Sequence, residues 1–204
     1  MNSKHLGDAF DHWKGSIIQR LGTKGLLQDI AVIPMFTDGP WNSEQISAYA
    51  NLLSVNVGKI QQKNRIFMGN KDDREKYFED ISYSGDLFLD PDIGISLSKN
   101  DREHIIIPDI GTVLSAQNDR VILIYQHKGR DNFPEKIEKI VHGVSNRIKN
   151  LNSATYDCGN VAMIFFSHDN GRIEKLTGYL KDMLSGDSLF LDESGTPNKR
   201  VMRW

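Results

Sequence analysis

Cysteine is almost missing from this chain of 204 residues, which contains only Cys158. A single cysteine cannot form an internal disulfide bond or a cysteine-rich zinc site, and this favours a reducing compartment. The first residues lack the apolar run of a signal peptide, and no stretch of about 18 apolar residues follows. We therefore expect a cytoplasmic protein that does not enter a membrane.

An excess of charge of one sign is also missing. The chain has 25 basic and 27 acidic residues, for a formal net charge of -2. Binding of RNA or DNA would therefore need a local basic patch. The candidate patch consists of Lys59, Lys63, Arg65, Lys71, Arg74 and Lys76. We expect these charges to form a solvent-exposed helical face, with contact to phosphate as the alternative.

Several catalytic signatures are absent. The chain has no Gly-x-Ser-x-Gly elbow and no Walker-type loop, which excludes a serine hydrolase of that kind and a P-loop nucleotide hydrolase. None of the six histidines has a partner at metal-ligand spacing, so no zinc site is expected among them.

What the chain does contain is an alternation of strand-like and helix-like segments. Buried strands are predicted at 29–36, 86–90, 121–125 and 161–166, and a short one at 66–68. Helices are predicted at 8–21, 43–53, 72–81, 134–150 and 172–184. Pro108 leaves two alternatives for 101–117, a kinked helix or a loop followed by a helix from Asp109. This alternation predicts one Rossmann-like, doubly wound α/β domain with a mostly parallel sheet over residues 1–185, and an irregular tail over 186–204.

The second of these strands ends in a pair of carboxylates. Leu87, Phe88 and Leu89 run directly into Asp90-Pro91-Asp92. The proline restricts the backbone around both acids, and ligands of open α/β sheets bind at the carboxyl ends of strands. The alternative is an ordinary strand exit with solvated aspartates.

Polar residues also follow two other predicted strands. Asp38 follows the first strand, and Gln126-His127-Lys128 follows the third. If these strands are parallel, their polar ends meet the carboxylate pair at one edge of the sheet. In the first helix, Asp11 and Lys14 lie three residues apart, and on this spacing alone we expect a surface ion pair.

Two short motifs carry a resemblance to a known family. Asp11-His12-Trp13-Lys14 keeps the Asp-x-x-Lys part of an Asn-His-x-Asp-x-x-Lys helix, and the stretch 86–92 resembles the strand that bears an Asp-Pro-Pro-Tyr motif. Over residues 8 to 130 the chain thus resembles Rossmann-fold methyltransferases of the ribosomal RNA adenine-N6 methyltransferase and three-Cys-motif partner type.

The resemblance implies S-adenosylmethionine as the cofactor and RNA or DNA as the partner. It implies that Lys14, Phe36 and Asp38 lie beside the cofactor. Asp90 and Asp92 would be catalytic, with Asp90 accepting a hydrogen bond from a substrate amino group.

The chain departs from this family at two points. Pro34 to Pro40 stand where a Gly-x-Gly turn would contact adenosylmethionine, and Asp92-Ile93 replace the Pro-Tyr on which a flipped base would stack. A divergent methyltransferase with unusual cofactor binding and a degenerate one without methyl transfer are both compatible with these departures.

Two other functions remain open. A Mg²⁺-dependent nuclease would use Asp92, Gln126 and Lys128, because such folds place an acid on one strand and an acid-x-Lys or Gln-x-Lys group on the next. In a variant of this pattern, Asp109 replaces Asp92. The third candidate is a non-catalytic binding or assembly module with a degenerate pocket.

Overall fold

The structure is a computed structural model that describes residues 1–62, 71–129 and 132–183. Its strands are β1 (Ala31–Pro34), β2 (Leu87–Asp90), β3 (Gly94–Ile95), β4 (His104–Ile105), β5 (Ile122–His127), β6 (Asn152–Asp157) and β7 (Val161–Ser167). Its α-helices are α1 (Ala9–Thr23), α2 (Ser43–Leu53), α3 (Lys71–Glu79), α4 (Ile107–Ser115), α5 (Phe133–Ser145) and α6 (Asn170–Met183). The predicted strand at 66–68 and the predicted tail at 186–204 lie outside the described residues.

Five strands form the main sheet in the order β1-β2-β5-β7-β6. β1, β2 and β5 are parallel, whereas β7 runs antiparallel to both β5 and β6. β3 and β4 form a separate parallel pair. The prediction of a mixed α/β fold with a mostly parallel sheet is confirmed.

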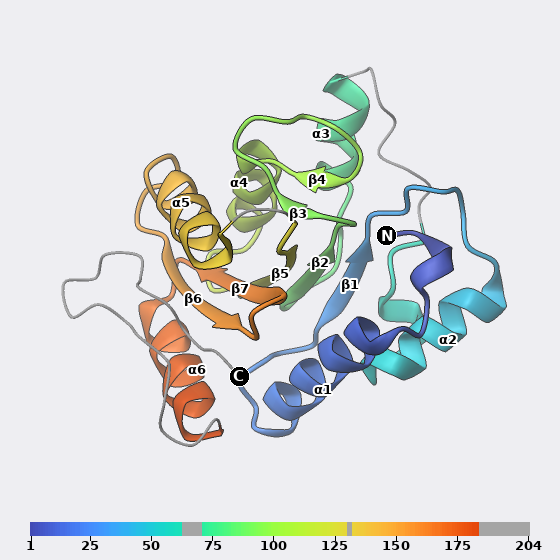
Figure 1. Ribbon diagram of the computed structural model, residues 1–204, viewed down its shortest axis with the longest axis horizontal. Helices are drawn as coiled ribbons and strands as arrows, with labels where there is room; N and C mark the ends of the chain where they lie inside the picture. The colour runs from blue at the N-terminus through green and yellow to red at the C-terminus, as the bar shows by residue number, and fades with distance from the viewer. Residues whose placement is uncertain (63–70, 130–131, 184–204) are drawn as a thin grey trace.

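Helices cover both faces of the sheet (Figure 1). Alternate residues of a strand point to opposite faces. Val32 and Phe88 therefore contribute to a core under α1, α2 and α6, and Ile33 and Leu89 to a core under α3, α4 and α5.

Several local predictions are confirmed. Asp8 caps α1 by accepting hydrogen bonds from the backbone of Phe10 and Asp11. Of the two alternatives for 101–117, the structure shows a helix that begins near Pro108 and not a kinked one: α4 starts at Ile107, and Pro108 lies in its first turn, where a missing N–H costs nothing. The prediction missed β6, an edge strand whose sequence lacks an apolar run, and also the short strands β3 and β4. None of the helices in the described ranges is long and apolar enough to cross a membrane.

The predicted basic patch is only partly exposed. The Arg74 side chain is buried and donates hydrogen bonds to both carboxylate oxygens of Asp109, with the shortest N–O distance 2.6 Å. It also donates to the backbone oxygen of His104 at 2.7 Å. The expectation that Arg74 belongs to a solvated face is therefore wrong, because this guanidinium joins α3 to the start of α4. Lys63 and Arg65 lie outside the described residues.

Buried aspartates stand at both ends of β2. Asp86, just before the strand, accepts hydrogen bonds from the Arg172 guanidinium at 2.7 and 2.8 Å. It also accepts from the backbone of Gln28 at 2.6 Å and of Val121 at 2.8 Å. Asp86, Phe88 and Asp90 share one face of the strand because their spacing is even. This is the face under α1 and α6, which supply the cations Lys14 and Arg172.

The contact between α1 and α2 depends on Gly15. A Cβ atom at this position would lie 1.9 Å from the backbone oxygen of Leu52 in α2. We expect Gly15→Ala to separate the two helices and lower the free energy of unfolding by about 1–3 kcal/mol. Gly22→Ala in the same helix is the matched control, since nothing lies within 4 Å of its added Cβ. The control should raise stability by about 0.5–1 kcal/mol. Urea unfolding measures the stability of both variants. Equal changes in the two would contradict the close contact between α1 and α2 at Gly15.

Candidate functional site at the carboxyl edge of the sheet

A cavity of about 310 Å³ lies where β2 and β5 end, next to the start of α1. We call it the edge cavity. Its lining includes Asp8, Phe10, Asp11, Lys14, Asp92, Ile93, Tyr125 and His127. Polar residues from the ends of two of the three strands, β2 and β5, meet at this edge, whereas Asp38 after β1 does not line the cavity.

Lys14 and the amino group of Met1 are both buried cations that line the edge cavity. The Lys14 ammonium lies 3.0 Å from Asp11 Oδ1 and 3.0 Å from Asp90 Oδ2. It also lies 4.2 Å from the centre of the Tyr125 ring, within the range of a cation–π contact. Asp11 and Lys14 are 1% and 4% exposed, so the expectation of a surface ion pair is wrong. The ion pair is buried because α1 lays this face of the helix on the end of β2.

Burial and the neighbouring charges shift the pKa values of Lys14 and Asp11. Burial alone lowers the pKa of Lys14, but the charges of Asp90 and Asp11 outweigh burial and raise it, so the side chain stays protonated. Burial raises the pKa of Asp11, and Lys14 offsets only part of that rise. Lys14 is therefore a fixed positive charge and not a nucleophilic amine.

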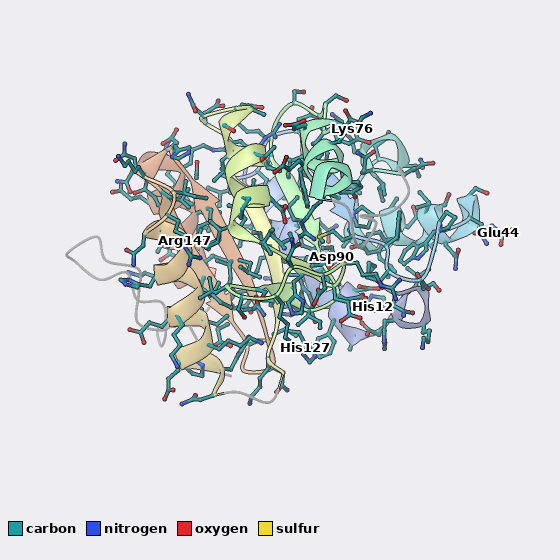
Figure 2. All side chains as sticks on the ribbon, turned by 90° about the horizontal axis from the view of Figure 1, so that it is seen from above. His12, Glu44, Lys76, Asp90, His127 and Arg147 are labelled. Atoms are coloured by element: carbon teal, nitrogen blue, oxygen red, sulfur yellow. The ribbon has the colours of Figure 1, made fainter. Side chains whose placement is uncertain are left out.

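Asp90 lies behind Lys14 and is fully buried. The Tyr49 hydroxyl, from α2, donates a hydrogen bond to the same oxygen that binds Lys14. The other oxygen, Oδ1, is buried and has no hydrogen-bond partner within the described ranges. Figure 2 shows Asp90 near the middle of the molecule, between the more peripheral Glu44 and Arg147. Asp90 therefore holds the Lys14 ammonium in position through its Oδ2.

Asp92 reaches the edge cavity itself. One of its oxygens lies 2.8 Å from the amino group of Met1, and the other accepts a hydrogen bond from the Thr37 hydroxyl. Its side chain is 20% exposed, in contrast to that of Asp90. Of the two aspartates that were predicted to be catalytic, Asp92 is the one that a ligand in the cavity can touch.

His127, the last residue of β5, forms another wall. Its Nδ1 accepts a hydrogen bond from the Gly129 backbone at 3.1 Å, so a neutral ring carries its proton on Nε2. Burial, and then the positive charge of Lys136, lowers the pKa of His127. The ring is therefore neutral at pH 7 and can donate a hydrogen bond through Nε2.

We expect His127 to titrate below the ordinary value for histidine, about 6.5. Its ring protons, followed by NMR across a pH series, give the pKa directly. Lys136→Met removes the second cause and should move the pKa upward toward the ordinary value. A wild-type pKa at or above 6.5, or a downward shift in the variant, would contradict this electrostatic assignment.

Two predicted cofactor residues do not line the edge cavity. Phe36 is buried and contacts the Trp41 ring at a centroid distance of 4.9 Å. Asp38 accepts hydrogen bonds from the backbone and hydroxyl of Ser3 and, at 3.4 Å, from the Trp41 indole. The structure thus brings Lys14, Asp90 and Asp92 together and places Phe36 and Asp38 in the neighbouring loop.

The residues of the nuclease alternative have other contacts. The Gln126 amide is buried and binds the backbone of Ile95 at 2.7 Å and of Ile93 at 3.1 Å. A Cβ added at Gly94 would lie 2.3 Å from this amide, so the glycine makes room for it. Over 1–62, 71–129 and 132–183, no three His, Cys, Asp or Glu side chains are grouped as metal ligands would be. The predicted metal-binding amide instead fixes the segment that follows β2.

Sequence reasoning did not select Tyr49, Phe10 or Tyr125. Tyr49 looks like any apolar member of the α2 stripe, and Tyr125 like the end of a buried strand. Their approach to Lys14 and Asp90 depends on how α1 and α2 lie on the sheet, which no local pattern encodes. The local signals for the cluster of Lys14, Asp11 and Asp90 were the Asp-x-x-Lys spacing in α1 and the carboxylate pair at the end of β2.

Comparison with known proteins adds no relative. The chain matches no protein-family model, no curated protein and no solved structure.

Proposed function

We propose that this chain is a divergent, methyltransferase-like protein that binds S-adenosylmethionine in the edge cavity. One observation carries the proposal. The cavity presents the carboxylates of Asp8, Asp11 and Asp92 together with the ammonium of Lys14 and the amino group of Met1, beside the aromatic rings of Phe10 and Tyr125. Such a lining suits a ligand that combines a cation, a zwitterionic amino acid group and a flat ring.

The residues of the cavity fit the chemical groups of this cofactor. The carboxylates can compensate its positive charges, Lys14 can bind its carboxylate, and an aromatic ring can contact its cationic sulfur. Adenosylmethionine supplies a methyl group on a positively charged sulfur, from which a nitrogen nucleophile can take it. Asp92 would accept a hydrogen bond from that amino group and orient it, while Asp90 holds Lys14 in place. RNA and DNA as acceptors are expectations from the resemblance.

We also propose that the fold is Rossmann-like. Three parallel strands, helices on both faces and a cavity at the carboxyl edge support it. The strand order is different from that of the classic dinucleotide fold, in which the first strand is central, because β1 lies at the edge of this sheet.

Calorimetric titration with adenosylmethionine tests the proposal. Saturable binding is expected, and Asp92→Asn should weaken it about tenfold, the effect of losing about 1.4 kcal/mol from one charged contact. Asp38→Asn is the matched control, because Asp38 lies outside the cavity lining. The affinity of this variant for adenosylmethionine should stay within about twofold of wild type. Absence of binding at millimolar cofactor would overturn the proposal. A larger loss of affinity in Asp38→Asn than in Asp92→Asn would indicate that the cofactor binds at the loop after β1 instead of in the edge cavity.

A further inference from the structure

A second cavity, of about 580 Å³, lies between α5 and the segment that follows β3. We call it the α5 cavity. It shares the wall residue Ile93 with the edge cavity, so the two lie on either side of the chain that leaves β2. Its volume is within the range of small-molecule sites, roughly 300–1,000 Å³. No catalytic or cofactor residue discussed above lines it.

The charge of the α5 cavity is opposite to that of the edge cavity. Lys99, Lys136 and Lys139 line it, and Glu135 is the one carboxylate among its lining residues. Asn132 binds that carboxylate through its side-chain amide at 2.6 Å. The positive charges thus outnumber the negative ones, and the site suits an anion.

One of these lysines is held in place. The Lys136 ammonium donates hydrogen bonds to the backbone oxygens of His127 at 3.1 Å and Lys128 at 3.0 Å. Because these bonds fix the side chain beforehand, a ligand loses less affinity in ordering it. The charge lies next to the end of β5, where it also lowers the pKa of His127.

The α5 cavity also has an apolar wall, to which Ile93, Ile95, Leu97 and Ile140 contribute. Ser96, Ser98 and His104 add polar groups to the lining. Leu97 is 39% exposed, one of the two large hydrophobic side chains exposed to this degree in the part of the chain that the structure describes. Gly143 allows the Leu97 side chain to lie close to α5, because a Cβ atom at position 143 would lie 2.8 Å from Leu97 Cδ2. A basic rim beside an apolar wall suits a phosphate group attached to a flat, weakly polar body.

We propose that the α5 cavity binds the phosphate of a nucleoside monophosphate, with the base against the apolar wall and the phosphate beside Lys99, Lys136 and Lys139. Phosphate and lysine form charge-assisted hydrogen bonds, which are stronger than neutral ones. This site is separate from the edge cavity, and the proposal holds whether or not adenosylmethionine binds there.

Calorimetric titration of the full chain with adenosine monophosphate, adenosine and inorganic phosphate tests this site. The monophosphate should bind at least about tenfold more tightly than either of its parts, since both the rim and the wall contribute. The double variant Lys99→Glu/Lys139→Glu should weaken it by about tenfold or more. The matched control is Lys175→Glu/Lys181→Glu, which makes the same charge change on α6, across the sheet, and should stay within about twofold.

Two further measurements separate the alternatives. Asp92→Asn should leave the affinity for the monophosphate unchanged, and Lys99→Glu/Lys139→Glu should leave any adenosylmethionine binding unchanged. A single-stranded oligonucleotide that displaces the monophosphate, and that the Lys99/Lys139 variant no longer binds, would support the phosphate site and identify nucleic acid as its source. Equal losses in both double variants, equal affinity for adenosine, or no saturable binding would overturn the proposal.

Discussion

Asp86→Ala is expected to lower the free energy of unfolding by about 3–5 kcal/mol, the scale for breaking a buried ion pair by removing one partner. Asp86 is fully buried, and its two oxygens accept four hydrogen bonds, two from Arg172 and two from backbone N–H groups. The substitution leaves the guanidinium without its carboxylate and two amides without an acceptor. The midpoint of urea unfolding, followed by circular dichroism, measures the loss.

The control for this variant is Asp119→Ala, which removes a nearby but exposed aspartate. It should change stability by no more than about 0.5 kcal/mol. Arg172→Met should resemble Asp86→Ala, and the double variant should lose less than the sum of the two, since both remove the same ion pair. A loss below about 1 kcal/mol for Asp86→Ala would show that the ion pair does not stabilise the sheet.

The second large effect is expected for Lys14→Met, which should lower the free energy of unfolding by about 3–5 kcal/mol at neutral pH. It leaves the carboxylates of Asp11 and Asp90 buried without their shared cation. Methionine fills a similar volume, so the loss reports the charge and not the packing. Urea unfolding again gives the magnitude.

The pH dependence of this loss identifies its cause. Burial raises the pKa of Asp11 above its usual 3.8, and Lys14 lowers it, so the variant should raise it further. A carboxyl group with a higher pKa when folded binds its proton more tightly in the folded state, and stability therefore rises as the pH falls through that pKa. The deficit of Lys14→Met should accordingly be smaller at about pH 5 than at about pH 7.

Lys59→Met is the matched control for this series. It removes the same charge from an exposed pair in which Lys59 lies 2.6 Å from Asp29. Its effect should be much smaller, because solvent screens an exposed pair. A deficit of Lys14→Met that does not change with pH would contradict the electrostatic explanation.

Much of the fold could be predicted because its strands are apolar runs. The segments that became β1, β2, β5 and β7 each contain a run of at least three apolar residues, as is typical of strands buried on both faces. β6 has no such run and was missed. Its place at the edge of the sheet next to an antiparallel neighbour also explains why a strand-helix alternation did not indicate it.

The candidate site could be predicted only in part, for a different reason. The carboxylate pair at the end of β2 and the Asp-x-x-Lys spacing in α1 are local signals, and of their residues Asp92, Asp11 and Lys14 line the observed cavity. Whether Lys14 is buried depends on Tyr49 and Tyr125, which are distant in the sequence. Asp38 was predicted at the site from its position after the first strand and from the resemblance, but in the structure it binds Ser3 and does not line the cavity.

The two buried aspartates of β2 also bear on the order in which the chain is made. Lys14 precedes Asp90 by 76 residues, so its cation has already been synthesised when β2 is made. Arg172 follows Asp86 by 86 residues. Until α6 has emerged, a nascent sheet that already contains β1, β2 and β5 buries a carboxylate without its cation. We therefore expect the sheet to reach its full stability during synthesis only after α6 has been made.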